Sequence, residues 1–344
     1  GGIDIEATTG ITSDTASLIS AAAIELDGGG GGDITVSGGD TAIDAVGNVD
    51  IDNDGGAVNV SGDIRSRTGS IVVGVETTEM MDVVAEVASF TAGDLEAGME
   101  VNLESDGVVT AGDIGAGQTS PVMINAGGTV TLGSVSGLDI LDDVDGDGIG
   151  DTPSMDTDGD GELDPDGLGD GVGSISITTS SGSVSLAGGL TTVGGIVINA
   201  DTGITNMNAS LISADVVDLD STSGTISVVG GDAVIDAVGN GTIDSSGAVR
   251  LAGDVVSGGA IQIGSTTAVA SLLVVDNLDG DTDEDRGTLV AKGDVIIIAS
   301  QAASAGATGD ITTGDIGGND VRIDSTDGDV DLGGLIARLV RRHQ

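Results

Sequence analysis

The sequence contains no cysteine, tryptophan or tyrosine, and it has a single phenylalanine among 344 residues. The absence of cysteine excludes disulfide bonds, thiolate nucleophiles and cysteine-ligated metal sites. With only one histidine, His343, triads and zinc sites built from several histidines are excluded as well. A core in this chain must therefore consist almost wholly of valine, isoleucine, leucine and alanine.

Positive charge is also scarce. Nine Lys and Arg residues stand against 57 Asp and Glu, which gives a formal net charge of −48 at pH 7. Such a chain is not expected to bind nucleic acid, because phosphates would be repelled and bases would find almost no ring to stack on. No apolar run approaches the roughly 18 residues of a membrane span, so no span is expected.

Aspartate accounts for 47 of the 57 acidic residues. Aspartate favours turns and cation-binding loops, which is typical of loop-rich β proteins in calcium-rich surroundings. From this composition we expect an extracellular or cell-surface location. The chain opens on Gly1 without an initiator Met or a signal peptide, and we interpret it as a processed or excised piece.

An internal repeat organises the chain. Residues 34–48 read ITVSGGDTAIDAVGN and residues 226–240 read ISVVGGDAVIDAVGN. Further along, TAGDIGAG at 110–117 matches TTGDIGGN at 312–319. Residues 1–133 and about 194–333 are therefore two copies of one long unit.

Short segments within each copy alternate apolar and polar residues with the period of a β-strand. Glycine, aspartate, asparagine and serine separate them and favour turns. Clear examples are residues 3–5, 34–36, 58–60, 226–228, 261–263 and 330–332.

Matching strands recur about every 21 residues, as from Ile3 to Ile24, which is a spacing typical of solenoid coils. We predict an all-β fold, a parallel β-solenoid or β-helix of about 14 or 15 coils with an irregular calcium-binding insert. A pair of immunoglobulin-like sandwiches is the alternative, although such sandwiches normally centre on bulky aromatics and have longer strands. The predicted domains are solenoid copy 1 at 1–137, the acidic insert at 138–173, solenoid copy 2 at 174–334, and a basic tail or cap at 335–344.

The repeat sequence resembles a known family. The stretch GDITTGDIGGNDVRIDSTDGDVDLGG at 309–334 is similar to the repeats of filamentous-haemagglutinin-type adhesins. Those are large secreted proteins whose repeats form a right-handed parallel β-helix, so the resemblance implies this fold for most of the chain. The N-terminal secretion domain of that family is not visible in this sequence.

The acidic insert contains two tandem loops of the form D-x-D-x-D-G-x-x-D. Carboxylates at positions 1, 3 and 5, a glycine at 6 and a main-chain carbonyl at 7 converge on one Ca²⁺ ion. The predicted ligands are Asp143, Asp145, Asp147, the carbonyl of Ile149 and Asp151 in the first loop, and Asp156, Asp158, Asp160, the carbonyl of Glu162 and Asp164 in the second.

These loops differ from EF-hands, because Ser154 and Gly167 occupy position 12 and no amphipathic helix flanks them. The stretch DTDGDGELDPDG at 156–167 resembles thrombospondin type 3 calcium repeats instead. The alternative is an acidic linker that binds no calcium. Without cations its carboxylates would repel one another, so we expect the insert to fold with calcium and to unfold in chelator.

A second acidic cluster lies in the second copy only. Carboxylates alternate there, but Glu284 stands where a calcium loop needs glycine. Calcium binding and a solvated loop are both open for this cluster. Its candidate ligands are Asp279, Asp281, Asp283 and Asp285.

The C-terminal residues 335–344 hold three of the nine basic residues, Arg338, Arg341 and Arg342. One reading is a short capping helix that lays Leu335 and later apolar residues over the last coil. The others are a basic tail that contacts the acidic body of the next subunit, and a disordered end.

Together these features predict a non-enzymatic, calcium-stabilised solenoid, a subunit of an extracellular filament, surface stalk or biofilm matrix that assembles by head-to-tail stacking. One alternative is a monomeric calcium-dependent adhesin segment with a cell-surface or matrix ligand. Another is a β-helix polysaccharide-degrading enzyme. That reading is disfavoured because sugars usually stack on aromatics and acidic polysaccharides need clustered Lys and Arg.

Overall fold

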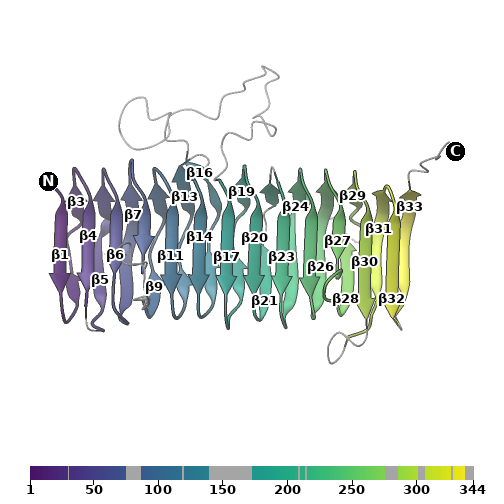
Figure 1. The fold of residues 1–344 in the computed structure, drawn as a ribbon, viewed down its shortest axis with the longest axis horizontal. Coiled ribbons are helices and arrows are strands. Elements are labelled where there is room, and N and C mark those ends of the chain that lie inside the picture. Colours follow the sequence, from purple (N-terminus) through teal and green to yellow (C-terminus); the bar gives the residue numbers. More distant parts are fainter. Residues whose placement is uncertain are drawn as a thin grey trace, which may run out of the picture. The chain divides into compact units, whose positions relative to one another are not determined.

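The computed structural model describes residues 1–29, 31–74, 87–117, 120–138, 173–207, 210–213, 215–275, 286–300, 307–326 and 328–337. Every regular element in these residues is a β-strand, and the strands pair in parallel (Figure 1). The predicted all-β class and the parallel β-solenoid are thus confirmed. In the described ranges, no helix has the length and apolar character needed to cross a membrane.

The chain divides into two compact units. The first unit comprises Gly1–Ser180 and Thr191–Val193, and the second comprises Ser181–Leu190 and Gly194–Gln344. The division falls close to the point where the second copy of the internal repeat begins. Strand β19 (Leu190–Thr192) has residues in both units.

Each coil of the first unit contributes one strand to a first sheet. Successive strands of this sheet pair in register, because each coil repeats the same apolar positions. The strands are β1 (Ile3–Ala7), β4 (Ile24–Gly28), β6 (Val49–Asp52), β8 (Ile71–Val73), β11 (Val101–Ser105), β14 (Val122–Ala126) and β17 (Ile175–Thr179).

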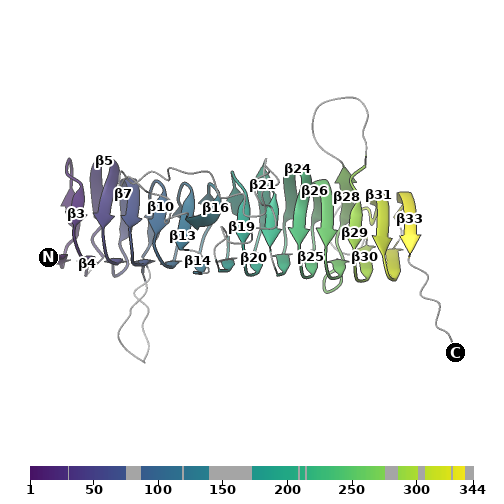
Figure 2. The ribbon, with the colours of Figure 1, turned by 90° about the horizontal axis from the view of Figure 1, so that it is seen from above.

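The rest of each coil in the first unit contributes a long bent strand, or two short strands, to a second sheet. Figure 2 shows strands of this sheet next to one another, in the order β5, β7, β10 and β13. The strands are β2 (Ile11–Ser13), β3 (Leu18–Ser20), β5 (Ile34–Ala45), β7 (Ala57–Ser66), β9 (Ser89–Thr91), β10 (Leu95–Ala97), β12 (Val109–Thr110), β13 (Ile114–Gly117), β15 (Val130–Leu132) and β16 (Val135–Leu138).

The second unit repeats this plan. Its first-sheet strands are β20 (Ile196–Ala200), β23 (Val217–Ser221), β25 (Gly241–Ser245), β27 (Ile261–Ile263), β30 (Val295–Ser300) and β32 (Val321–Thr326). Its second-sheet strands are β18 (Val184–Leu186), β21 (Gly203–Met207), β22 (Leu211–Ser213), β24 (Thr225–Ala237), β26 (Ala248–Ser257), β28 (Ser271–Val275), β29 (Leu289–Ala291), β31 (Ile311–Gly318) and β33 (Val330–Ala337).

Coil length varies more than the sequence spacing predicts. Ile3 pairs with Ile24, 21 positions later, whereas Val122 pairs with Ile175, 53 positions later, because residues 139–172 fall inside that coil. Within the described residues the first sheet has seven strands in the first unit and six in the second. The estimate of 14 or 15 coils was therefore too high, because it assumed that every coil has the same length.

Stacked rows of aliphatic side chains form the interior of each unit. In the first unit, Leu103 is fully buried and lies in register between Val73 of the preceding coil and Ile124 of the following coil. Its neighbour Asn102 points outward, as expected from the alternation of a strand. The only phenylalanine, Phe90, is fully buried in the same interior.

The described C-terminal residues differ from one prediction. Strand β33 continues through Ala337, and the side chain of Leu335 is 58% exposed. A capping helix that starts at Leu335 is therefore wrong for residues 335–337, which belong to β33 and pair in parallel with residues 316–318 of β31. Residues 338–344, including the three arginines of the tail, lie outside the described residues.

The substitution Leu103→Ala tests the stacked core. Removing this fully buried side chain should lower the free energy of unfolding by about 2–5 kcal/mol, through lost burial and a residual cavity. The matched control is Asn102→Ala on the outward face of the same strand, which should change stability by less than about 1 kcal/mol. Urea unfolding of both variants measures the difference, and equal losses would contradict the inward assignment of Leu103.

Candidate functional site

All predicted calcium ligands lie outside the described residues. This applies to both insert loops, with Asp143, Asp145, Asp147, Ile149, Asp151, Asp156, Asp158, Asp160, Glu162 and Asp164, and to the cluster of Asp279, Asp281, Asp283 and Asp285. Their calcium binding stays a prediction. In the part of the chain that the structure describes, no group of three or more acidic or histidine side chains is arranged to hold a metal ion.

Two rows of carboxylates run across the outer face of the first sheet in the first unit. One row contains Asp4, Glu25 and Asp50 in register, and a parallel row contains Glu6, Asp27 and Asp52. Strands in a sheet lie about 4.8 Å apart, so each carboxylate has a like charge directly above or below it. The sequence signal is the alternation Ile-Asp-Ile-Glu, Ile-Glu-Leu-Asp and Val-Asp-Ile-Asp in β1, β4 and β6.

Burial and the stacking of like charges change the acidity of Asp50, the last carboxyl of the first row. Burial, Glu25 and Asp52 together raise the pKa of Asp50 from 3.8 to about 6, with burial the largest cause. On the other side of Asp50, strand β8 places the uncharged Val72 in register. Proton uptake at Asp50 therefore relieves repulsion within the row.

The second copy has a similar acidic patch at the corresponding strands β23 and β25. Burial is the main cause that raises the pKa of Asp218, with further contributions from Asp220 and Asp244. Burial and Asp244 likewise raise the pKa of Asp220. The same face of each unit thus carries closely spaced carboxylates.

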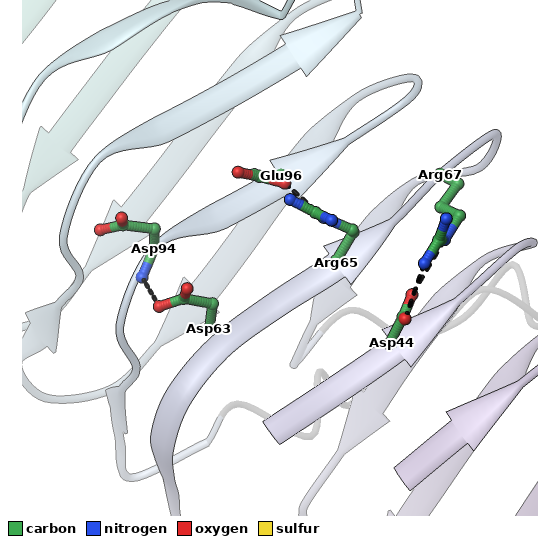
Figure 3. A network of polar contacts seen from close by, with 6 residues as sticks. All are labelled: Asp44, Asp63, Arg65, Arg67, Asp94 and Glu96. Atoms are coloured by element: carbon green, nitrogen blue, oxygen red, sulfur yellow. Dashed lines mark hydrogen bonds and ion pairs between the residues drawn. The ribbon is translucent and has the colours of Figure 1, made fainter. Parts of the chain in front are cut away.

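A second set of aspartates accepts hydrogen bonds from the backbone. In Figure 3 the Asp63 carboxylate accepts a hydrogen bond from the backbone N–H of Asp94, one coil later, at 2.9 Å. The Asp94 carboxylate accepts one from Asp113 N–H at 2.8 Å, and the Asp113 carboxylate accepts one from Ser134 N–H at 2.7 Å. These residues form a ladder in which each coil supplies the acceptor for the next coil. We call it the aspartate ladder.

Equivalent contacts recur elsewhere in both units, always with the accepting side chain in the earlier coil and the donating N–H in the later one. This arrangement satisfies backbone donors at the turns, where no strand partner is in place. The acceptors are Asp33, Asn48, Asn240, Asp244, Asp254, Asp294 and Asp310, and the respective donors are Ala57, Ser70, Ala260, Thr266 with Thr267, Thr288, Asp320 and Asp329.

A glycine precedes each aspartate of the ladder, and at two of these positions a larger residue is excluded by steric clash. A Cβ on Gly93 would lie 2.5 Å from the Asp63 carboxylate oxygen, and a Cβ on Gly112 would collide with the Asp94 carboxylate. The signal was present in the sequence as a recurring Gly-Asp-apolar triplet, but its role was not recognised. Examples stand at 32–34, 62–64, 93–95, 112–114, 253–255, 293–295, 309–311, 314–316 and 328–330.

Two arginines link neighbouring coils on the outer face of the second sheet (Figure 3). Arg65 pairs with Glu96 of the following coil at 2.5 Å, and Arg67 pairs with Asp44 of the preceding coil at 2.9 Å. Both pairs are partly exposed, so each contributes at most about 1 kcal/mol. They fix the spacing of charged side chains next to the aspartate ladder.

A shallow hollow of about 210 Å³ lies in the first unit at the ends of strands β11, β14 and β17. Small and acidic residues line it, among them Glu104, Asp106 and Asn125. Its volume is below the roughly 300 Å³ at which pockets for drug-sized ligands begin.

The substitutions Gly112→Ala and Asp94→Ala test the aspartate ladder as a double-mutant cycle. The new methyl group of Gly112→Ala must displace the Asp94 carboxylate and so break its bond to Asp113 N–H. Each single change should therefore cost about 1–2 kcal/mol of unfolding free energy, and the double variant should cost no more than either. Additive losses in urea unfolding would show that the two residues act independently.

The raised pKa of Asp50 predicts a pH dependence. The folded state binds this proton below about pH 6, whereas the unfolded carboxyl binds it near 3.8. Lowering the pH through 6 should therefore stabilise the wild type relative to Asp50→Asn, until the difference levels off near pH 4. Because both proteins contain all the other carboxyls, the contributions of those groups to stability cancel in the difference. A stability difference between the two proteins that stays constant from pH 4 to 8 would contradict the assignment.

Comparisons with known proteins show no relative. No family model matches the chain, and neither a curated protein nor a solved structure matches it. The parallel β-solenoid is compatible with β-helix repeat proteins in general. The resemblances to filamentous-haemagglutinin repeats and to thrombospondin type 3 loops stay predictions from the sequence.

Proposed function

We propose that this chain is an extracellular, non-enzymatic structural protein, a subunit of a filament, surface stalk or matrix. The observation that carries the proposal is the coil-to-coil ladder within each unit. Within each unit, parallel strand pairing joins neighbouring coils, and at several coils a side-chain cap adds to it, such as the Asp94 carboxylate that accepts the Asp113 N–H. A stack held this way resists extension along its axis, because each coil adds its own set of backbone hydrogen bonds.

Calcium stabilisation is part of the same proposal and is supported by the sequence of the insert. The two D-x-D-x-D-G loops within residues 143–164 carry the oxygen ligands that Ca²⁺ prefers. Extracellular calcium modules bind with dissociation constants on the order of 10⁻⁴ to 10⁻³ M. The net charge of −48 supports a location in a cation-rich medium, where repulsion within the carboxylate rows is screened.

The calcium prediction is tested with two variants of equal charge. The insert variant changes Asp143, Asp147, Asp156 and Asp160 to Asn, and the control changes Asp4, Asp27, Asp50 and Asp52 to Asn. Titration calorimetry should show calcium binding in the wild type and the control, and its loss in the insert variant, because only the insert variant removes carboxylates at loop positions 1 and 5. Equal loss in both variants would indicate diffuse charge screening instead of calcium loops.

Negative-stain electron microscopy tests the structural role itself. Wild-type protein in calcium should form elongated assemblies, and chelator should reduce their length or number. A strict monomer at high concentration under both conditions would contradict the filament proposal and favour the monomeric adhesin. Turnover of a pectin- or alginate-like polymer would favour the enzyme alternative.

A further inference from the structure

The first coil of the first unit has a sheet edge with apolar side chains that are only partly covered. In the part of the chain that the structure describes, strand β1 pairs only with β4, and its inward residues Ile3 and Ile5 are partly exposed. One coil later their row neighbours Ile24 and Leu26 are fully buried. A coil stacked on β1 would bury this edge in the same way.

The last described coil of the second unit has the opposite edge. The inward residues Val321 and Ile323 of β32 are partly exposed, whereas Val295 and Ile297 in the preceding strand are fully buried. In β33, Val330 is 47% exposed. Among the described residues, both edges are therefore apolar along the inner rows and only partly covered.

The internal repeat shows that these edges carry equivalent positions. The repeat aligns Ile11 with Ile204, and from Ile204 the row continues coil by coil to Val330. It also aligns Leu18 with Leu211, whose row ends at Leu335. Ile11 and Leu18 are themselves aliphatic, so each would continue the matching row by one more aliphatic residue.

The hydrogen-bonding groups at the two edges also match. The Asp294 and Asp310 carboxylates accept the backbone N–H groups of Asp320 and Asp329. Asp320 and Asp329 are exposed and occupy the acceptor position for one more coil. In the first coil, the residues at the donor positions of these two rows are Gly2 and Gly10, as the registers of β1 with β4 and of β2 with β5 place them.

The charges on the outer face of the two edges are also complementary. The row that contains Asp4 in the first unit corresponds to the row that ends at Arg322 in the second. Arg322 is exposed and bonds Asp324 on its own strand at 3.0 Å. Stacked on β1, it would lie over Asp4 and between the acidic side chains of both strands, which offsets the like charges of Asp324 and Glu6.

From these matches we infer that the last coil of the second unit stacks in register on the first coil of the first unit of another copy, with β32 against β1 and β33 against β2 and β3. The partner is a second copy of this chain. The contact is heterologous and head-to-tail, so it leaves a new free edge after each addition. The inference rests on the proposed structural role and names the surface that assembly would use.

Engineered disulfides test the register, since the chain has no cysteine of its own. In Asp4→Cys/Arg322→Cys, the two Cα atoms of neighbouring copies would lie about 4.8 Å apart, within disulfide range. In the control Asp4→Cys/Asp324→Cys they would lie about 8 Å apart, which is too far. Glu25→Cys/Asp50→Cys, whose partners lie in register within one chain, shows that the oxidation works.

After mild oxidation in calcium, we expect disulfide-linked multimers of Asp4→Cys/Arg322→Cys on a non-reducing gel and several-fold fewer for the control. Mixing the two single-cysteine proteins should give the mixed dimer in excess over either homodimer. The interface would be overturned if Asp4→Cys/Arg322→Cys and Asp4→Cys/Asp324→Cys cross-linked equally. It would also be overturned if neither cross-linked while Glu25→Cys/Asp50→Cys formed its disulfide within one chain. Elongated assemblies without the expected cross-link would retain the structural role and reject this surface. A monomer that gives neither would reject both.

Discussion

Each coil stacks on the preceding one in register at a separation of about 4.8 Å, and the other features of both units depend on this constraint. A residue therefore has the equivalent residue of the neighbouring coil as its closest contact. Aliphatic side chains gain from this arrangement, because rows such as Val73, Leu103 and Ile124 bury one another. The same contact forces glycine at positions such as Gly112, where a Cβ would meet a carboxylate of the coil before.

In-register stacking places like charges next to one another as readily as like hydrophobic groups. The chain resolves this in two ways. Aspartates at the turns, such as Asp63 and Asp94, accept backbone N–H bonds from the next coil. On the sheet face, burial and the repulsion between stacked carboxylates favour the protonated form of Asp50 and raise its pKa. One residue type thus has two roles according to its place in the coil.

Much of the fold could be predicted from the sequence. The segments at 34–36, 226–228 and 261–263 lie in strands, because alternation with period two is a local property of the chain. The number of coils and the end of β33 were less accessible. Coil length depends on where the chain next meets its partner strand, as with Val122 and Ile175, and no local pattern encodes that distance.

From the amino-acid sequence alone it follows that the protein is all-β, built from a duplicated unit, with an aliphatic interior and a large excess of aspartate. These properties follow from composition, periodicity and self-similarity, which need no partner residue to be identified. The folded arrangement of the coils settles which aspartates cap the next coil and which stack against like charges. It also decided that the Gly-Asp triplets form a ladder. A carboxylate acts according to the groups within about 3–5 Å, and in this solenoid those groups come from neighbouring coils, 19 or more residues away along the chain.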